Sequence, residues 1–159
     1  MNSNESDPKV LEAEKKGRDL AKKVLLSIDP SLKIKFTKED DKDDPNTAFD
    51  IFFVSAGTTT VCVEVKYRNY TYNRFPDWWF DEYKINRLLS LPEKTKKGKP
   101  TAKMVMCVHE DGYRIWDIDA PHTTTEGLFP KCEVHPERGK IWKTVCQYKN
   151  KDAKWYGEF

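Results

Sequence analysis

Residues 49–67 read FDIFFVSAGTTTVCVEVKY and contain two runs that are typical of β-strands, residues 49–54 and 60–67. Both runs are rich in β-branched and aromatic residues, which fit a pleated surface. The segment between them includes Gly57, a residue suited to the tight turn of a hairpin. The pattern predicts a β-hairpin, and the apolar residues beside each charged position indicate buried strands at the centre of a sheet.

Two carboxylates meet on this predicted hairpin. Asp50 and Glu64 are equally distant from Gly57, so antiparallel pairing places them opposite each other, where two like charges repel unless a positive group lies between them. Carboxylate oxygens are the ligands that Mg²⁺ prefers. Alternation puts Lys66 on the same face as Glu64, where an ammonium group can bind a phosphate oxygen or position an attacking water. A solvated, charged sheet face is the competing interpretation.

Residues 8–28 show the spacing of an amphipathic helix. Its apolar stripe contains Val10, Gly17, Ala21, Val24 and Ile28. Glu14 falls on the same stripe, and an inward-pointing carboxylate requires a counter-charge, either Lys66 or a metal ion. Gly17, one turn further on, allows the helix to approach the sheet closely.

The sequence outside these two segments predicts further helices, strands and loops. We expect a strand at 33–36, a loop at 38–47, a second helix at 77–91, and strands at 102–109 and 113–118. From about residue 120 the pattern is harder to interpret, although residues 140–148 and 154–159 are typical of strands.

The composition is that of a globular protein. The chain has 159 residues, of which 38% are hydrophobic and 34% charged, and it is expected to form one domain over residues 1–159. No window approaches the roughly 18 apolar residues of a membrane-spanning helix, and the N-terminus lacks the apolar stretch of a signal peptide. We therefore expect a cytoplasmic, intracellular protein without a membrane partner.

The four cysteines are scattered along the chain and do not predict disulfides. A zinc site can be drawn from Cys132, His135, Cys146 and His122, but the chain has no CxxC pair. Reduced thiols that pack as small apolar side chains are the preferred interpretation.

At Asp50 and at Glu64-Val65-Lys66 the chain resembles the PD-(D/E)XK nuclease superfamily, although Phe49 stands where the name-giving proline would be. The resemblance covers about residues 8–118 and implies a restriction-endonuclease-like α/β core, with a central mixed sheet flanked by helices in the order α-β-β-β-α-β-β. It implies a Mg²⁺ site, with Mn²⁺ as a substitute, formed by Asp50, Glu64, the carbonyl group of Val65 and the helical Glu14. Residues 119–159 would be a C-terminal extension.

Several cationic side chains are candidates for contacts with nucleic acid. The predicted second helix offers Tyr83, Lys84 or Arg87 near the site, as such enzymes commonly do. Mixtures of cations and aromatic rings suit phosphate contacts and base stacking. The candidate nucleic-acid-binding residues are Arg68, Arg74, Lys84, Lys96, Lys97 and Lys99. A solvated basic loop is the alternative interpretation for the lysines of residues 94–100.

The expected activity is metal-dependent hydrolysis of phosphodiester bonds in DNA, with RNA as the open alternative. Two other functions compete with it. One is a catalytically silent nucleic-acid-binding module of the same fold. The other is a protein-interaction domain of viral or phage origin that uses Trp78 and Trp79 as exposed anchors. The oligomeric state stays open, with a homodimer as one alternative.

Overall fold

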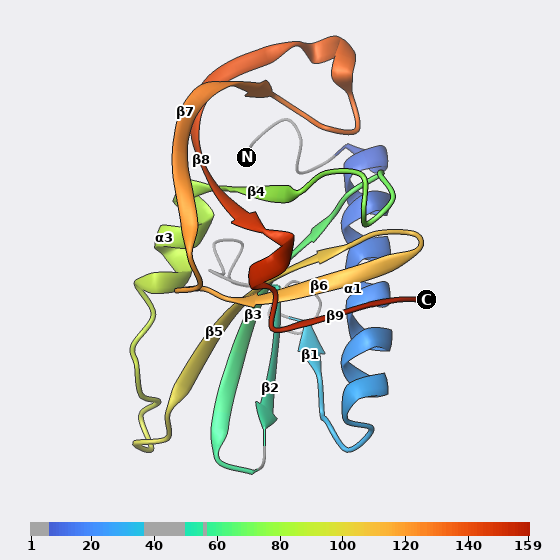
Figure 1. Ribbon diagram of the computed structural model, residues 1–159. Coiled ribbons are helices and arrows are strands. Elements are labelled where there is room, and N and C mark those ends of the chain that lie inside the picture. Colours follow the sequence, from blue (N-terminus) through green and yellow to red (C-terminus); the bar gives the residue numbers. More distant parts are fainter. Residues whose placement is uncertain (1–6, 37–49, 56) are drawn as a thin grey trace.

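The structure is a computed structural model that describes residues 7–36, 50–55 and 57–159. The expected loop at 38–47, Phe49 and Ala56 lie outside these described residues. The described residues form two sheets and two α-helices (Figure 1). In chain order the elements are α1 Pro8–Ile28, β1 Lys35–Phe36, β2 Ile51–Ser55, β3 Thr59–Tyr67, β4 Asp77–Asp81, α3 Glu82–Leu89, β5 Thr101–Val108, β6 Gly112–Asp117, β7 His122–Pro130, β8 Lys140–Lys149 and β9 Trp155–Glu158, with 3₁₀ turns at Pro136–Arg138 and Asn150–Asp152.

In the part of the chain that the structure describes, the central sheet has six strands in the order β1-β2-β3-β5-β6-β9. The pairing of β3 with β5 is parallel and the other pairings are antiparallel, so the sheet is mixed. Helices α1 and α3 lie on opposite sides of it (Figure 1). The expected α/β class with a central mixed sheet flanked by helices is thus confirmed.

The hairpin of β2 and β3 has the predicted register. Ile51 pairs with Val63 and Ser55 pairs with Thr59, so residues equally distant from Gly57 are opposed. Gly57 has a φ angle of 70°, in the left-handed region that favours glycine. Gly57 therefore adopts the backbone conformation that closes the hairpin.

Alternation along β3 divides its side chains between two cores. Val61 and Val63 pack with Ala21, Val24 and other residues under α1. Cys62 faces the other way and packs with α3 and the second sheet. Both faces of β3 are therefore buried, as the continuous apolar run predicted. Glu64 and Lys66, an even number of residues from Cys62, point toward the second side.

Helix α1 begins and ends at local signals. The Asp7 side chain accepts hydrogen bonds from the N–H groups of Lys9 and Val10, at 2.9 and 3.3 Å, which satisfies two donors that the first turn leaves unpaired. Pro8 occupies the first turn, where its missing N–H costs nothing. The helix ends at Ile28, before Asp29-Pro30, and has the bounds that the spacing predicted.

The second helix is shorter than predicted, and the expectation for its first part was wrong. Residues Asp77–Asp81 form strand β4, and only Glu82–Leu89 are helical. Strand β4 pairs with β8, from Asp77 opposite Lys149 to Asp81 opposite Val145. The expected order α-β-β-β-α-β-β consequently gains a strand before the second helix. The partner strand lies more than 60 residues later in the chain, beyond the reach of local patterns.

The tryptophans expected to be exposed are not. Trp78 is 3% exposed and packs edge-on against Phe75 and beside His109. Trp79 is half-buried and lies under the guanidinium group of Arg68. They cannot act as anchors on an open surface, because β4 turns one toward the core and the other toward a cleft. The exposed tryptophan is Trp142, at 67%.

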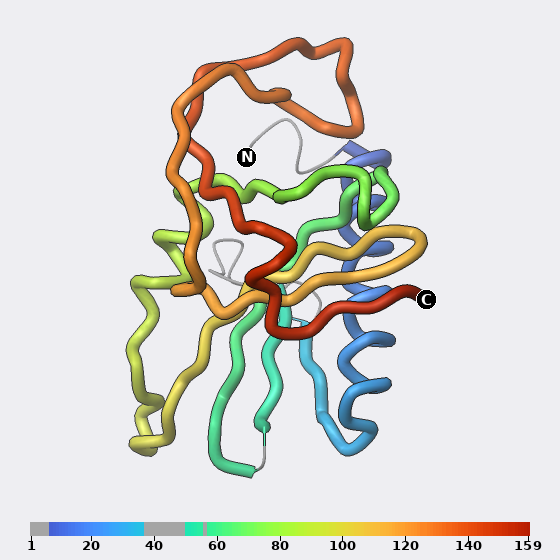
Figure 2. The backbone as a smooth tube through the Cα atoms, viewed as in Figure 1, coloured from blue at the N-terminus to red at the C-terminus, as the bar shows by residue number. Residues whose placement is uncertain are grey.

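The C-terminal part of the chain forms the second sheet, in the order β4-β8-β7. Strands β7 and β8 pair over nine residues, from His122 opposite Tyr148 to Pro130 opposite Lys140. Their long hairpin curves away from the central sheet, and its tip reaches the N-terminal end of α1 (Figure 2). No helix in the described parts of the chain is both long and apolar enough to cross a membrane.

Candidate active site

Asp50 and Glu64 lie at the open end of the β2–β3 hairpin, the end opposite the turn at Gly57. Asp50 directly precedes β2, and its N–H donates to the carbonyl group of Val63 at 3.0 Å. The register of the hairpin, extended by one residue, places it opposite Glu64. The carboxylate of Asp50 accepts a hydrogen bond from the N–H of Val65 at 2.8 Å, and Glu64 is only 7% exposed. The structure therefore brings both carboxylates to one place, as the sequence predicted.

A cleft of about 530 Å³ opens at these residues. Its walls come from four parts of the chain: α1, the β2–β3 hairpin, the β4–α3 segment and the β7–β8 hairpin. All four predicted central residues, Asp50, Glu64, Lys66 and Glu14, line it. Among the described residues, six cationic and five carboxylate side chains share its lining, so it is neither a simple anion site nor a simple cation site.

Helix α1 reaches the cleft because Gly17 brings it close to β3. A Cβ atom on Gly17 would lie 3.1 Å from the Cβ of Tyr67, which is tighter than ordinary packing. Glu14, half-buried one turn earlier, thereby lines the cleft together with Arg18. The close approach that the sequence predicted for Gly17 is present, and it accounts for the presence of Glu14 at the site.

Two lysines with opposite pKa shifts stand beside the carboxylates. Burial, and after it the charges of Lys84 and Arg68, lowers the pKa of Lys66 to about 7. Burial also acts against the charge of Lys84, but Glu64 and other negative groups more than offset it and raise the pKa of Lys84. The Lys84 Nζ lies 3.7 Å from the Glu64 Oε1. One amine is therefore firmly charged near neutral pH, and the other can gain or lose a proton there.

The second sheet and the connection between β7 and β8 add three charged residues that were not among the predicted site residues. Glu133, in the segment after β7, forms ion pairs with Arg68 and with Lys66, the latter at 4.0 Å. Asp81, at the end of β4, pairs with Lys143 of β8 at 2.9 Å. Burial opposes the charge of Asp81, but Lys143 and the other nearby lysines keep its pKa below the usual value. No local motif marks these residues, because only strand pairing brings them to the cleft.

The predicted nucleic-acid contacts do not form one surface. Lys84 lines the cleft, whereas Arg74 is exposed in the loop after β3 and lies over the ring of Phe75. Arg68 is 3% exposed and paired with Glu133, so it does not present an open phosphate contact.

The lysine-rich loop, residues 94–100, lies at the end of the central sheet opposite the cleft. Thr60 pairs with Thr101, directly after this loop, whereas Lys66 pairs with Cys107. At about 3.3 Å per residue, the loop is roughly 20 Å along β3 from Lys66. Lys96, Lys97 and Lys99 are exposed there. They are separated from the cleft by the length of the strand.

The donor set of the cleft fits magnesium better than zinc. Asp50 and Glu64 supply carboxylates, and Val65, whose N–H contacts Asp50, lines the same space. Among the residues that the structure describes, no group of three His, Cys, Asp or Glu side chains is arranged to hold a metal. A metal here would rest on two carboxylates, a backbone carbonyl and water, and magnesium characteristically keeps several waters.

Three of the four side chains of the alternative zinc site have other neighbours, and the fourth, Cys132, is a buried free thiol. Cys146 is buried in the core on the α3 side of the sheet. His122 stacks on Tyr148, and His135 contacts Asp7 at 2.9 Å. The reduced-thiol interpretation agrees with these positions, because each cysteine is buried and free.

Comparison of the chain with protein-family models, with curated proteins and with solved structures finds no match.

Proposed function

We propose that the chain is a metal-dependent nuclease that hydrolyses phosphodiester bonds in DNA. One observation carries the proposal: Asp50, Glu64 and Lys66, which the sequence singled out, line one cleft together with Glu14. Opposed carboxylates at this depth need positive charge, and a phosphodiester needs cations beside its non-bridging oxygens. The mixed lining of the cleft supports both requirements.

Asp50, Glu64 and the carbonyl group of Val65 would hold Mg²⁺ or Mn²⁺. The metal would supply positive charge that stabilises the phosphate oxygens as negative charge develops on them. Glu14 extends the acidic wall of the cleft from α1. The remaining chemistry belongs to the lysines.

Lys66 and Lys84 support different parts of the reaction. Water attacks phosphorus, the P–O bond to the leaving oxygen breaks, and a proton from the water must be removed. Lys66, with a pKa of about 7, can accept a proton or position the water. Lys84 keeps its positive charge beside Glu64 and can stabilise the phosphate in the transition state.

A binding module without catalysis is the second candidate, and one observation favours it. Lys84 already lies within ion-pair distance of Glu64, so this carboxylate has a counter-charge without any metal. Such a module would bind nucleic acid through the cations of the cleft, and it would not need divalent ions.

The deciding experiment is a cleavage assay with purified wild-type protein on supercoiled, linear and single-stranded DNA and on RNA, with Mg²⁺ or Mn²⁺ and with EDTA. We expect metal-dependent cleavage that Asp50→Asn abolishes. Asp117→Asn is the matched control, because the Asp117 side chain is 43% exposed on β6 and lies outside the cleft lining. Binding without cleavage of any substrate would favour the module, and wild-type cleavage by Asp50→Asn would refute the assigned site.

A further inference from the structure

Glu133 brings a carboxylate into the cleft from a distant part of the chain. It belongs to residues 131–139, which connect β7 to β8 at the tip of the curved hairpin (Figure 2). There it pairs with both Arg68 and Lys66. Two cations at the end of β3 therefore converge on one anion that the tip provides.

Arg68 is built to hold an anion. Its side chain is 3% exposed, its guanidinium lies 4.2 Å from the centre of the Trp79 ring, and it donates to the Trp79 carbonyl group. These contacts fix the planar group in one orientation. A buried guanidinium requires a partner of opposite charge, and its fork geometry suits carboxylate and phosphate oxygens alike.

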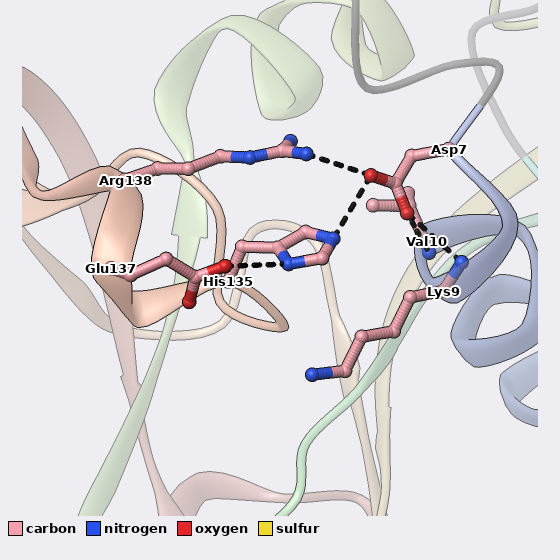
Figure 3. Close-up of polar contacts among 6 residues, drawn as sticks. All are labelled: Asp7, Lys9, Val10, His135, Glu137 and Arg138. Carbon is pink, nitrogen blue, oxygen red and sulfur yellow. Dashed lines mark hydrogen bonds and ion pairs between the residues drawn. The ribbon is translucent and has the colours of Figure 1, made fainter.

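The tip that carries Glu133 is fastened to helix α1. The Asp7 carboxylate lies 2.9 Å from the His135 Nε2 and accepts a hydrogen bond from the Arg138 Nη2 at 2.7 Å (Figure 3). Glu137 holds the other ring nitrogen of His135, at 2.9 Å. We call the contacts of Asp7 with His135 and Arg138 the latch. Polar groups make the latch, so it can open without exposing a large apolar core.

We propose that Arg68 and Lys66 form an anion subsite that Glu133 occupies, and that a substrate phosphate takes this place when the tip lifts. The inference rests on the proposed function, because it assigns a regulated phosphate position to the same cleft. Glu133 is then an internal competitor, and the latch sets how often the subsite is free. A ligand that binds only the open state has its affinity reduced by the fraction of molecules that are open.

The experiment measures phosphate affinity without metal. Inorganic phosphate is titrated by NMR, and a labelled single-stranded DNA oligonucleotide is titrated by fluorescence anisotropy, both in EDTA at fixed salt. Glu133→Gln removes the competing charge. The double variant His135→Ala/Arg138→Ala opens the latch and leaves Arg68 with its carboxylate, so it also serves if Glu133→Gln folds poorly. Glu126→Gln, exposed on β7, is the control with the same change of net charge.

We expect Glu133→Gln and the latch variant to bind phosphate at least about tenfold more tightly than wild type, which corresponds to a subsite that is open in a tenth of molecules or fewer. Glu126→Gln should behave as wild type. Adding Lys66→Met to Glu133→Gln should reverse the gain. Unchanged or weaker phosphate affinity in Glu133→Gln would overturn the inference.

The outcomes separate this inference from the proposed function. Tighter phosphate binding in both variants, with no cleavage of any polymer by wild type, would support the subsite and refute the nuclease. Cleavage that depends on Asp50, with unchanged phosphate affinity in Glu133→Gln, would support the nuclease and refute the subsite. Loss of cleavage in Glu133→Gln at unchanged phosphate affinity would place Glu133 in the reaction itself and overturn its role as competitor.

Discussion

Lys66 and Lys84 show how position alone gives two identical side chains different chemistry. Lys84 has Glu64 at 3.7 Å, with Asp50 and Asp81 as further sources of negative charge. Lys66 is desolvated among cations, and its pKa falls to about 7. Their pKa values diverge within one cleft, which suits Lys66 to proton transfer and Lys84 to the stabilisation of negative charge.

Replacing Lys66 with alanine should therefore affect rate more than binding. Under the proposed function we expect Lys66→Ala to lower the single-turnover cleavage rate roughly a hundredfold, the scale of losing one preorganised electrostatic contact. Its DNA affinity should change much less. Lys97→Ala, at the far end of the sheet, should leave the rate unchanged. Cleavage at wild-type rate by pure Lys66→Ala would contradict the assigned role.

His109 is a second residue whose surroundings decide its charge. The ring is fully buried, Nδ1 lies 2.9 Å from the Tyr70 carbonyl oxygen, and Trp78 packs beside it. Burial, ahead of the other causes, lowers the pKa of His109 from its ordinary value of 6.5 to about 4. The native ring is thus neutral under conditions in which the unfolded chain protonates it.

This difference predicts how stability depends on pH. Between pH 6.5 and about 4 the unfolded state binds more protons at this position, so the free energy of unfolding falls as the pH falls. The full contribution of the shift is about 3 kcal/mol. Urea denaturation across this range should show a shallower pH dependence for His109→Phe than for wild type. Identical slopes would mean that the native ring does protonate.

At the scale of elements, the segment Asp77–Leu89 shows where local patterns mislead. Its sequence DWWFDEYKINRLL suggests one helix, yet it divides at Asp81 into strand β4 and helix α3. Trp and Phe fit a strand as well as a helix. The choice depends on β8, which offers an edge for β4 to pair with. The division also matters to the site, because it places Asp81 at the end of β4 and Lys84 in the first turn of α3, where both line the cleft.

Helix α1 supplies an element-scale prediction at Gly17. Alanine adds a Cβ atom 3.1 Å from the Cβ of Tyr67, but it also favours the helix by about 1 kcal/mol, so Gly17→Ala should change stability little. Gly17→Val should destabilise by about 1–3 kcal/mol, because its methyl groups overfill the contact. Lys15→Val, at an exposed position of the same helix, is the control for propensity. Thermal unfolding measures all three, and equal losses for Gly17→Val and Lys15→Val would refute the tight contact.

At the scale of the whole molecule, the cleft is a meeting point of distant segments. Residues 10–18 of α1, the hairpin residues 50 and 64–67, residues 79–87 and residues 130–143 all contribute to its lining. The long β7–β8 hairpin connects the last of these segments in the sequence with the first, because His135 and Arg138 at its tip contact Asp7, the residue before α1 (Figure 3). The described C-terminal part is therefore a wall of the candidate site rather than a peripheral extension of the core.

The sequence by itself determined the features that rest on short-range periodicity. These are the bounds of α1, the register of β2 with β3, the shared face of Glu64 and Lys66, and the close approach at Gly17. Each follows from residues within one or two elements, where the steps of helix and strand dictate direction. Whether these side chains perform the predicted chemistry stays a prediction.

Only the tertiary structure decided the features that depend on long-range pairing. Strand β4 required β8, and the positions of Asp81, Glu133 and Lys143 required the second sheet. The lysine-rich loop lies far from the cleft because β3 pairs with β5 in parallel, and no local pattern encodes this pairing. The physical reason is the same in each case: a strand has unsatisfied backbone groups along both edges, and the partner that satisfies them can lie anywhere in the chain.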